Sequence, residues 1–249
     1  RIHPSTDGHL VMAYLFLKAQ GLAGKPVADI RIDGAGKKVT RSDNCRVSDL
    51  SVSSDNLTFT YEAKSLPYPI DTSYYDNEKH TQADALSVIP FMDEMNYEGL
   101  SVSGLSDGYY GLTIGREFIG RFTARELERG INMALLQNTP QYKQAMKIRQ
   151  MNEERWLKER KMREFYWVEY NLMRKTGMLW ACNEAAVDTL RKYRPHDIFL
   201  QWNGDLWLQY MHKGIREDCV NEQQDLVNQI YEQNKPIPLR IEIKKFTDL

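Results

Sequence analysis

A histidine near the start of the chain is the strongest candidate for a catalytic residue in this sequence. His3 precedes Pro4, and Ser5–Asp7 follow before a run of apolar residues. Proline disfavours helical backbone at the residue before it, whereas Ser, Thr and Asp favour the start of a helix. We therefore expect His3 in a fixed turn where a helix begins. A histidine held there can act as a general base if a hydroxyl and an orienting carboxylate lie within reach. The alternative is a surface-loop histidine without a catalytic role.

A second pattern, at residues 104–108, has the G-x-S-x-G form of a nucleophile elbow around Ser106. An elbow needs a strand, a sharp turn and then a helix. Here Tyr110, Leu112 and Ile114 alternate with other residues, which predicts a second strand after the turn. We interpret the pattern as a hairpin turn and Ser106 as a turn residue.

The remaining titratable residues favour neither a metal nor a cofactor. Residues 71–98 hold seven acidic residues against one lysine, without the spacing of a metal-binding loop. We interpret this stretch as a solvated loop, with calcium binding as the minority alternative. His196, Asp197 and His212 match no zinc spacing. The cysteines are Cys45, Cys182 and Cys219, and they form no CxxC pair. Their odd number does not indicate whether the protein belongs to a reducing or an oxidising compartment.

The elements that position these residues begin with one helix and a β-rich stretch. Residues 10–17 are apolar nearly all round, so a helix ending near Gly21 is expected to be buried on several sides. Residues 24–26 are interpreted as a linker. Alternating apolar residues separated by turn signals then predict short strands near 27–32, 47–52, 57–62, 100–102 and 110–114.

The second half of the chain is predicted to be helical. Thr123 and Glu126 form a capping box for a helix over 124–136. Pro140 starts a long helix that no Gly or Pro interrupts before Gly177. Further helices are expected over 184–193 and 217–232, and residues 239–243 predict a final strand that returns to the β-rich stretch. The tryptophans, all in this half, are interpreted as core residues, with stacking on sugar rings as the alternative.

The opening residues resemble a known enzyme family. Ile2-His3-Pro4 and Gly8-His9, in register with the apolar helix, resemble the last conserved block of SGNH (GDSL-type) hydrolases. These are serine esterases on a flavodoxin-like three-layer α/β domain. The resemblance implies that His3 is the catalytic base. The Asp of that block would fall one position before Arg1, and the serine and oxyanion blocks further upstream. The chain is thus expected to be a truncated C-terminal part and inactive by itself.

A looser resemblance extends along the chain. Residues 108–114, 130–134 and 139–142 are similar to the tail of some bacterial SGNH hydrolases, which carries a β-rich and helical extension. The resemblance implies an α+β chain: the terminal helix of a flavodoxin-like SGNH domain, a small β-sandwich-like module and a helical region with one long helix. The expected domains are 1–24, the last SGNH block and its helix; 25–122, the β-rich module; 123–235, the helical extension; and 236–249, the returning strand.

Composition narrows the function classes. The chain has 249 residues and a net charge of −1, which argues against a generally basic nucleic-acid binder. No apolar run reaches the roughly 18 residues of a membrane span. The favoured hypothesis is a serine acylhydrolase acting on a small-molecule or carbohydrate ester, and by resemblance a periplasmic or extracellular one. The alternative is a non-catalytic glycan- or protein-binding module, and a third is an oligomerisation role for the long helix.

Overall fold

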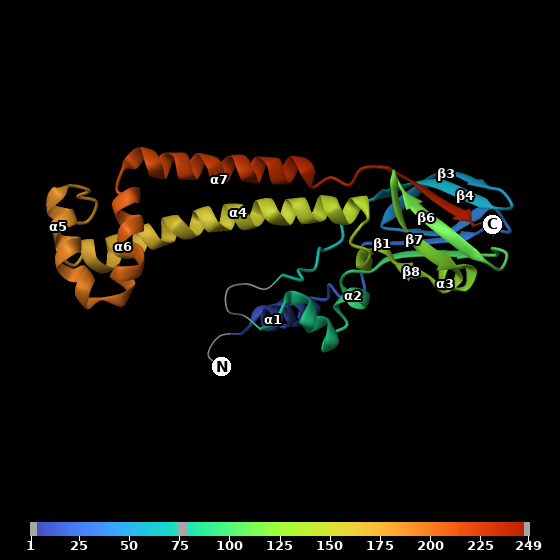
Figure 1. Ribbon diagram of the computed structural model, residues 1–249, viewed down its shortest axis with the longest axis horizontal. Coiled ribbons are helices and arrows are strands. Elements are labelled where there is room, and N and C mark those ends of the chain that lie inside the picture. The colour runs from blue at the N-terminus through green and yellow to red at the C-terminus, as the bar shows by residue number, and fades with distance from the viewer. Residues whose placement is uncertain (1–3, 74–78, 247–249) are drawn as a thin grey trace. The chain divides into compact units, whose positions relative to one another are not determined.

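A computed structural model describes residues 4–73 and 79–246 (Figure 1). Its two sheets and several helices confirm the α+β class. The chain divides into two compact units. The first comprises Arg1–Lys147 and Asn234–Leu249, and the second comprises Ile148–Gln233. We call them the sandwich unit and the helical unit.

Two sheets form the body of the sandwich unit. The smaller has the order β2 (Lys38–Asp43), β1 (Ala28–Asp33), β5 (Glu98–Ser103) and β8 (Ile131–Asn132). The larger has the order β3 (Cys45–Val52), β4 (Asn56–Ala63), β9 (Leu239–Lys245), β6 (Tyr109–Ile114) and β7 (Glu117–Thr123). β1 and β5 are parallel, whereas the pairs within the larger sheet are antiparallel.

The core of this unit lies between the two sheets. Period-2 alternation sends every second side chain of a strand to one face. One hydrophobic cluster contains the inward residues of both sheets, among them Ile30, Leu100 and Val102 from the smaller and Phe59, Leu112 and Ile241 from the larger. The sheets therefore pack face to face as a sandwich.

Strand β9 joins the two halves of the larger sheet. Ile241 lies opposite Phe59 of β4 and Ile114 of β6, and it is fully buried. The last strand of the described chain thus pairs on both sides with strands from the β-rich stretch.

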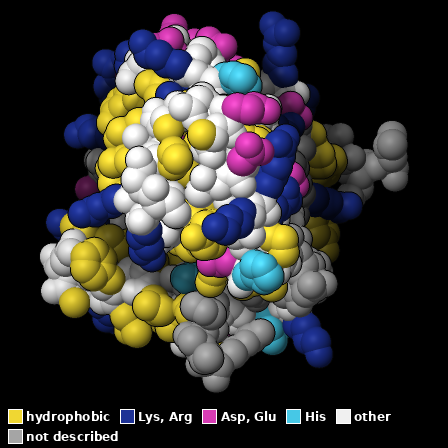
Figure 2. Space-filling model, turned by 90° about the vertical axis from the view of Figure 1, so that its left-hand side faces the viewer, with side chains coloured by type: hydrophobic (Ala, Val, Ile, Leu, Met, Phe, Trp, Pro, Cys, Tyr) yellow, Lys and Arg dark blue, Asp and Glu magenta, His cyan; other side chains and the backbone are white. Residues whose placement is uncertain are grey.

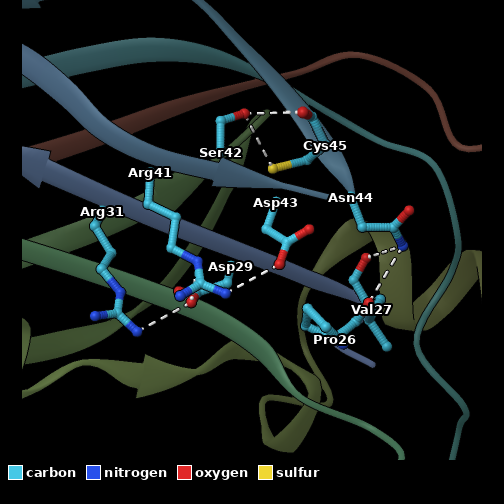
Figure 3. A network of polar contacts seen from close by, with 9 residues as sticks. All are labelled: Pro26, Val27, Asp29, Arg31, Arg41, Ser42, Asp43, Asn44 and Cys45. Atoms are coloured by element: carbon cyan, nitrogen blue, oxygen red, sulfur yellow. Dashed lines mark hydrogen bonds and ion pairs between the residues drawn. The ribbon is translucent and has the colours of Figure 1, made fainter. Parts of the chain in front are cut away.

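A polar corner carries the chain from one sheet to the other between β2 and β3 (Figure 3). Asn44 has a φ of 53°, a left-handed conformation that Asn tolerates. Its Nδ2 donates to the Val27 carbonyl at 2.9 Å and to Ser65 Oγ at 3.1 Å. Beside it, the buried Asp29 carboxylate pairs with Arg31 and Arg41 at 3.1 and 2.9 Å. The two guanidinium groups compensate the cost of burying that charge.

Helix α1 (Thr6–Ala19) is less buried than its composition suggests. Leu10 and Tyr14 pack in a cluster with η1 (Gln82–Ser87) and α2 (Phe91–Glu94). Met12, Leu15 and Phe16 are more than half exposed. The expectation of burial on several sides is therefore wrong for the described chain, because protein packs against only one face of this helix.

Two other expectations in the sandwich unit need correction. The predicted helix over 124–136 is only α3 (Ala124–Arg129), because Gly130 adopts a φ of 94° and residues 131–132 pair with β5 as β8. The acidic stretch 71–98 is not wholly a solvated loop. It contains η1 and α2, and Glu98 begins β5 and is fully buried. Asp76 and Glu78 lie outside the described residues.

The helical unit contains most of α4 (Pro140–Val168), the π-helical segment η3 (Glu169–Met173), α5 (Glu184–Tyr193), η4 (Arg194–His196), α6 (Ile198–Tyr210) and α7 (Lys213–Gln233). Helices α4 and α7 run side by side (Figure 1), and Lys158 of α4 pairs with Glu222 of α7 at 2.7 Å. The sequence analysis missed α6. None of the helices in the described ranges combines the length and apolar character that a membrane crossing requires.

Replacing Ile241 with alanine tests the role of β9. The change removes buried methyl groups between β4 and β6, so we expect the free energy of unfolding of the sandwich unit to fall by about 2–5 kcal/mol. All five tryptophans lie in the helical unit, so amide hydrogen exchange in β4 and β6 is the suitable measurement. The control is Ile237→Ala, at a side chain 58% exposed. Equal protection in the two variants would contradict this role.

Candidate functional site

The residues that follow His3 form a compact polar turn, although His3 itself lies outside the described residues. Ser5 Oγ donates to the Asp7 carboxylate, and the Gly8 backbone N–H donates to Asp7 Oδ1 at 2.8 Å. His80 Nδ1 lies 3.8 Å from Asp7 Oδ2. The hydrogen bond from Ser5, assisted by Gly8 and His80, lowers the pKa of Asp7.

The order of these three side chains differs from that of a catalytic triad. In a triad the histidine lies between the serine and the carboxylate, where it can take the serine proton. Here Asp7 lies between Ser5 and His80, so no base contacts the Ser5 hydroxyl through this arrangement. The cluster instead fixes the backbone immediately after His3. A Cβ on Gly8 would lie 3.0 Å from Pro4 Cβ, so the turn also favours glycine there.

Ser106 is confirmed as a residue outside any nucleophile elbow, although its turn is not a hairpin. The turn joins β5 of one sheet to β6 of the other, and no helix follows it. Ser106 Oγ accepts from Lys245 Nζ at 2.7 Å and lies 3.1 Å from the Tyr110 hydroxyl. A lysine ammonium offers no acceptor for the serine proton, so this contact does not activate Ser106.

Asp197, which the sequence places between His196 and His212, has a structural role in the helical unit. Asp197 caps helix α6, since its Oδ1 accepts from the backbone N–H groups of Phe199 and Leu200 at 2.8 and 3.2 Å. This cap is the signal by which the sequence could have indicated α6. Within residues 4–73 and 79–246, no three His, Cys, Asp or Glu side chains lie close enough together to hold a metal ion.

Glu98 is a buried carboxyl group that the sequence analysis placed in a solvated loop. It begins β5 and is fully buried. Its Oε1 accepts from the Tyr61 hydroxyl of β4 at 2.8 Å and from Gln141 Nε2 of α4 at 3.1 Å. The alternation of Glu98 with Leu100 and Val102 was the available signal, because all three occupy one face of the strand.

The environment of Glu98 favours its neutral form. Burial raises the pKa of this carboxyl group to about 7, although the hydrogen bonds from Tyr61 and Gln141 oppose the change. Burial, with Glu98 nearby, also moves the pKa of Tyr61 above its ordinary range. In the described structure Glu98 Oε2 and Gln141 Oε1 have no hydrogen-bond partner. A proton on Oε2 removes the uncompensated charge, which favours the protonated form of Glu98 at the start of β5.

A second fully buried carboxyl group lies directly after the end of α4, in the helical unit. Glu169 is fully buried in the π-helical segment η3. Its Oε1 accepts from the indole Nε1 of Trp207 at 2.8 Å, and its Oε2 from the backbone N–H of Trp180 at 2.9 Å. Trp180 has a φ of 60°, a strained conformation for a bulky residue, which this hydrogen bond helps to hold.

The tryptophans divide between core and surface. Trp207 is fully buried, as the core interpretation predicts. Trp156, Trp180 and Trp202 are 45%, 46% and 67% exposed, so that interpretation is wrong for these three. Figure 2 views the molecule from the end where Figure 1 shows α5 and α6, and hydrophobic side chains lie there beside Lys and Arg side chains. Exposed aromatic residues beside cationic ones are a common feature of binding surfaces.

Comparison with known proteins identifies similar proteins for both units. Residues 146–235 match the family described as the diltiazem deacetylase C-terminal helical domain. The whole fold is similar to a solved structure described as BT4096, a gut microbial diltiazem-metabolizing enzyme, with 40% sequence identity and a TM-score of 0.93. The match covers 98% of this chain and 55% of the other, so the chain spans about half the length of that enzyme. No curated protein matches the sequence.

The pKa of Glu98 predicts a pH dependence of stability. The folded state holds the proton up to about pH 7, whereas an ordinary glutamic acid releases it near 4.5. The stabilisation is fully present below 4.5 and is lost as the pH rises through 7, a change of about 3 kcal/mol. We expect Glu98→Gln to remove this loss, as measured by urea unfolding from pH 4 to 8.

The matched control is Glu128→Gln, at an exposed glutamate of the same unit. It should leave the fall in stability between pH 4.5 and 7 unchanged. An unchanged pH profile in Glu98→Gln would show that another group causes the dependence.

Proposed function

We propose that this chain is the C-terminal part of a serine ester hydrolase that removes an acyl group from a small-molecule or carbohydrate ester. The observation that carries the proposal is the likeness to a diltiazem-metabolizing enzyme over 98% of this chain at 40% identity. The match of the helical residues to a family named for a deacetylase supports the same reaction class. A deacetylase transfers an acetyl group to water, which is acyl-transfer chemistry.

In this proposal His3 is the general base of an SGNH-type serine esterase. It takes the proton from a serine hydroxyl as that oxygen attacks the ester carbonyl, and it returns the proton to the leaving alcohol. Water then attacks the acyl-enzyme, again with His3 as base, and releases the acid and the free serine. The serine and the Asp that orients His3 belong to residues outside this chain. The role of Ser5, Asp7 and Gly8 is to hold the backbone that follows His3.

The exposed face of α1 supports the presence of such a domain in the active enzyme. Met12, Leu15 and Phe16 lie more than half exposed on a helix whose other face is packed. In the proposal these side chains are covered by the α/β domain that provides the serine.

The experiment begins with the coding sequence upstream of Arg1 and then compares two proteins. We expect an Asp codon directly before Arg1 and a Gly-Asp-Ser block a domain length earlier. The longer protein should release 4-nitrophenolate from 4-nitrophenyl acetate, whereas the present chain should show only the background rate. In the longer protein His3→Ala should lower kcat by at least about 10³-fold.

His9→Ala is the matched control, because His9 is exposed on the first turn of α1 and has no role in the proposed mechanism. It should change kcat by less than about twofold. Full activity of the His3→Ala variant, or His3-dependent hydrolysis by the present chain alone, would overturn the corresponding part of the proposal.

A further inference from the structure

A groove on the surface of the helical unit gathers exposed aromatic side chains. Its volume is about 630 Å³, within the size range of small-molecule sites. We call it the aromatic groove and define it by Trp156, Arg160, Arg163 and Trp167 of α4 together with Phe199 and Trp202 of α6. The α4 residues are spaced by three or four positions, which places them along one face of that helix.

Three of the four rings in the groove contact one another without being buried. The centroids of Trp167 and Phe199 lie 5.3 Å apart, and those of Phe199 and Trp202 lie 5.4 Å apart in an edge-to-face arrangement. Trp202 is 67% exposed and Phe199 is 50% exposed. A mutually supported set of exposed rings offers a large apolar surface that needs little ordering when a ligand binds.

The charge of the groove is positive. Two guanidinium groups line it against one carboxylate, Glu164, which accepts from Arg160 Nε at 2.7 Å. Arg163 lies 5.6 Å from the centre of the Trp156 ring, and its nearest carboxylate, Glu159, is 3.8 Å away. Both arginine side chains are more than half exposed. A guanidinium beside an aromatic face can bind an anionic group through paired hydrogen bonds while the ring stacks on the body of the ligand.

We propose that the aromatic groove binds a small organic anion with a planar aromatic body. The ring system lies against Trp156, Trp202 and Phe199, and the carboxylate, sulfonate or phosphate group lies against Arg160 and Arg163. Every residue involved belongs to the helical unit, and none has a role in the proposed ester hydrolysis. A neutral sugar could stack on the rings but lacks the negative charge that the two guanidinium groups attract.

Two fluorescent probes with the same aromatic body test this assignment. One is 8-anilinonaphthalene-1-sulfonate, and the other is N-phenyl-1-naphthylamine, which lacks the sulfonate. We expect the anionic probe to bind the present chain saturably with one site, and Trp202→Ala to weaken its binding about tenfold or more. Arg163→Gln should weaken the binding of the anionic probe by a similar factor. It should change the affinity for the neutral probe by less than about twofold.

Matched controls separate the groove from other exposed surface. Tyr231→Ala changes a ring that is 74% exposed on α7 outside the groove, and Arg191→Gln changes an exposed arginine of α5. Both should bind the anionic probe as the unchanged chain does. Circular dichroism should show the same helix content for all variants. Arg163→Gln retains every ring of the groove and therefore tests the proposal independently if Trp202→Ala is poorly folded.

Four results would overturn the proposal. Equal affinity for the two probes would show that the guanidinium groups do not select an anion. Equal loss of binding in Trp202→Ala and Tyr231→Ala would show that the probe adheres to exposed rings in general. A concentration-dependent dimer that Trp202→Ala converts to a monomer in light scattering would make the groove an interface between copies. Competition by neutral oligosaccharides, but not by aromatic carboxylates, would instead indicate glycan binding and would also overturn it.

Discussion

The larger sheet depends on the insertion of β9 between β4 and β6. Without this strand, β3–β4 and β6–β7 would be two separate antiparallel pairs, and β4 and β6 would each become an unpaired edge. The core residues of β9 are fully or almost fully buried, so the strand contributes apolar packing as well as backbone hydrogen bonds. Because β9 follows the helical unit in the chain, the sandwich core is complete only after the helical residues have been synthesised.

Two buried carboxyl groups form hydrogen bonds near the two ends of helix α4. Near its start, Gln141 donates to Glu98 of the smaller sheet, to which Tyr61 of the larger sheet also donates. At its end, Glu169 accepts from Trp207 of α6 and from the backbone at Trp180. Buried polar groups of this kind need their hydrogen bonds, because an unpaired buried charge is costly. They therefore hold the start of α4 on the sandwich unit, and the segment that follows α4 on the helices of the helical unit, more specifically than apolar contacts alone.

Local signals in the sequence predict most of the helices and strands. Which side chains are buried, and which residues they contact, depends on the tertiary structure. Alternation over 57–62 and 110–114 corresponds to β4 and β6, and the capping box at Thr123 is present at the start of α3. Strand β2 was missed because its side chains are largely exposed and show no clear alternation. The acidic composition of residues 71–98 favours a loop, although the alternation of Glu98 with Leu100 and Val102 is that of a strand. The aromatic groove could not be predicted, since it combines residues of α4 with residues of a helix that the analysis missed.

The helical unit is an insertion in the chain of the sandwich unit. The chain leaves the sandwich unit along α4 and re-enters it before β9, and Gln144 Nε2 donates to the Lys235 carbonyl at 2.8 Å, so the points of exit and re-entry are adjacent. An insertion whose ends lie close together can change in length or sequence without altering the host fold. Selection can therefore reshape the surface of the helical unit while the sandwich, and the turn that follows His3, retain their structure.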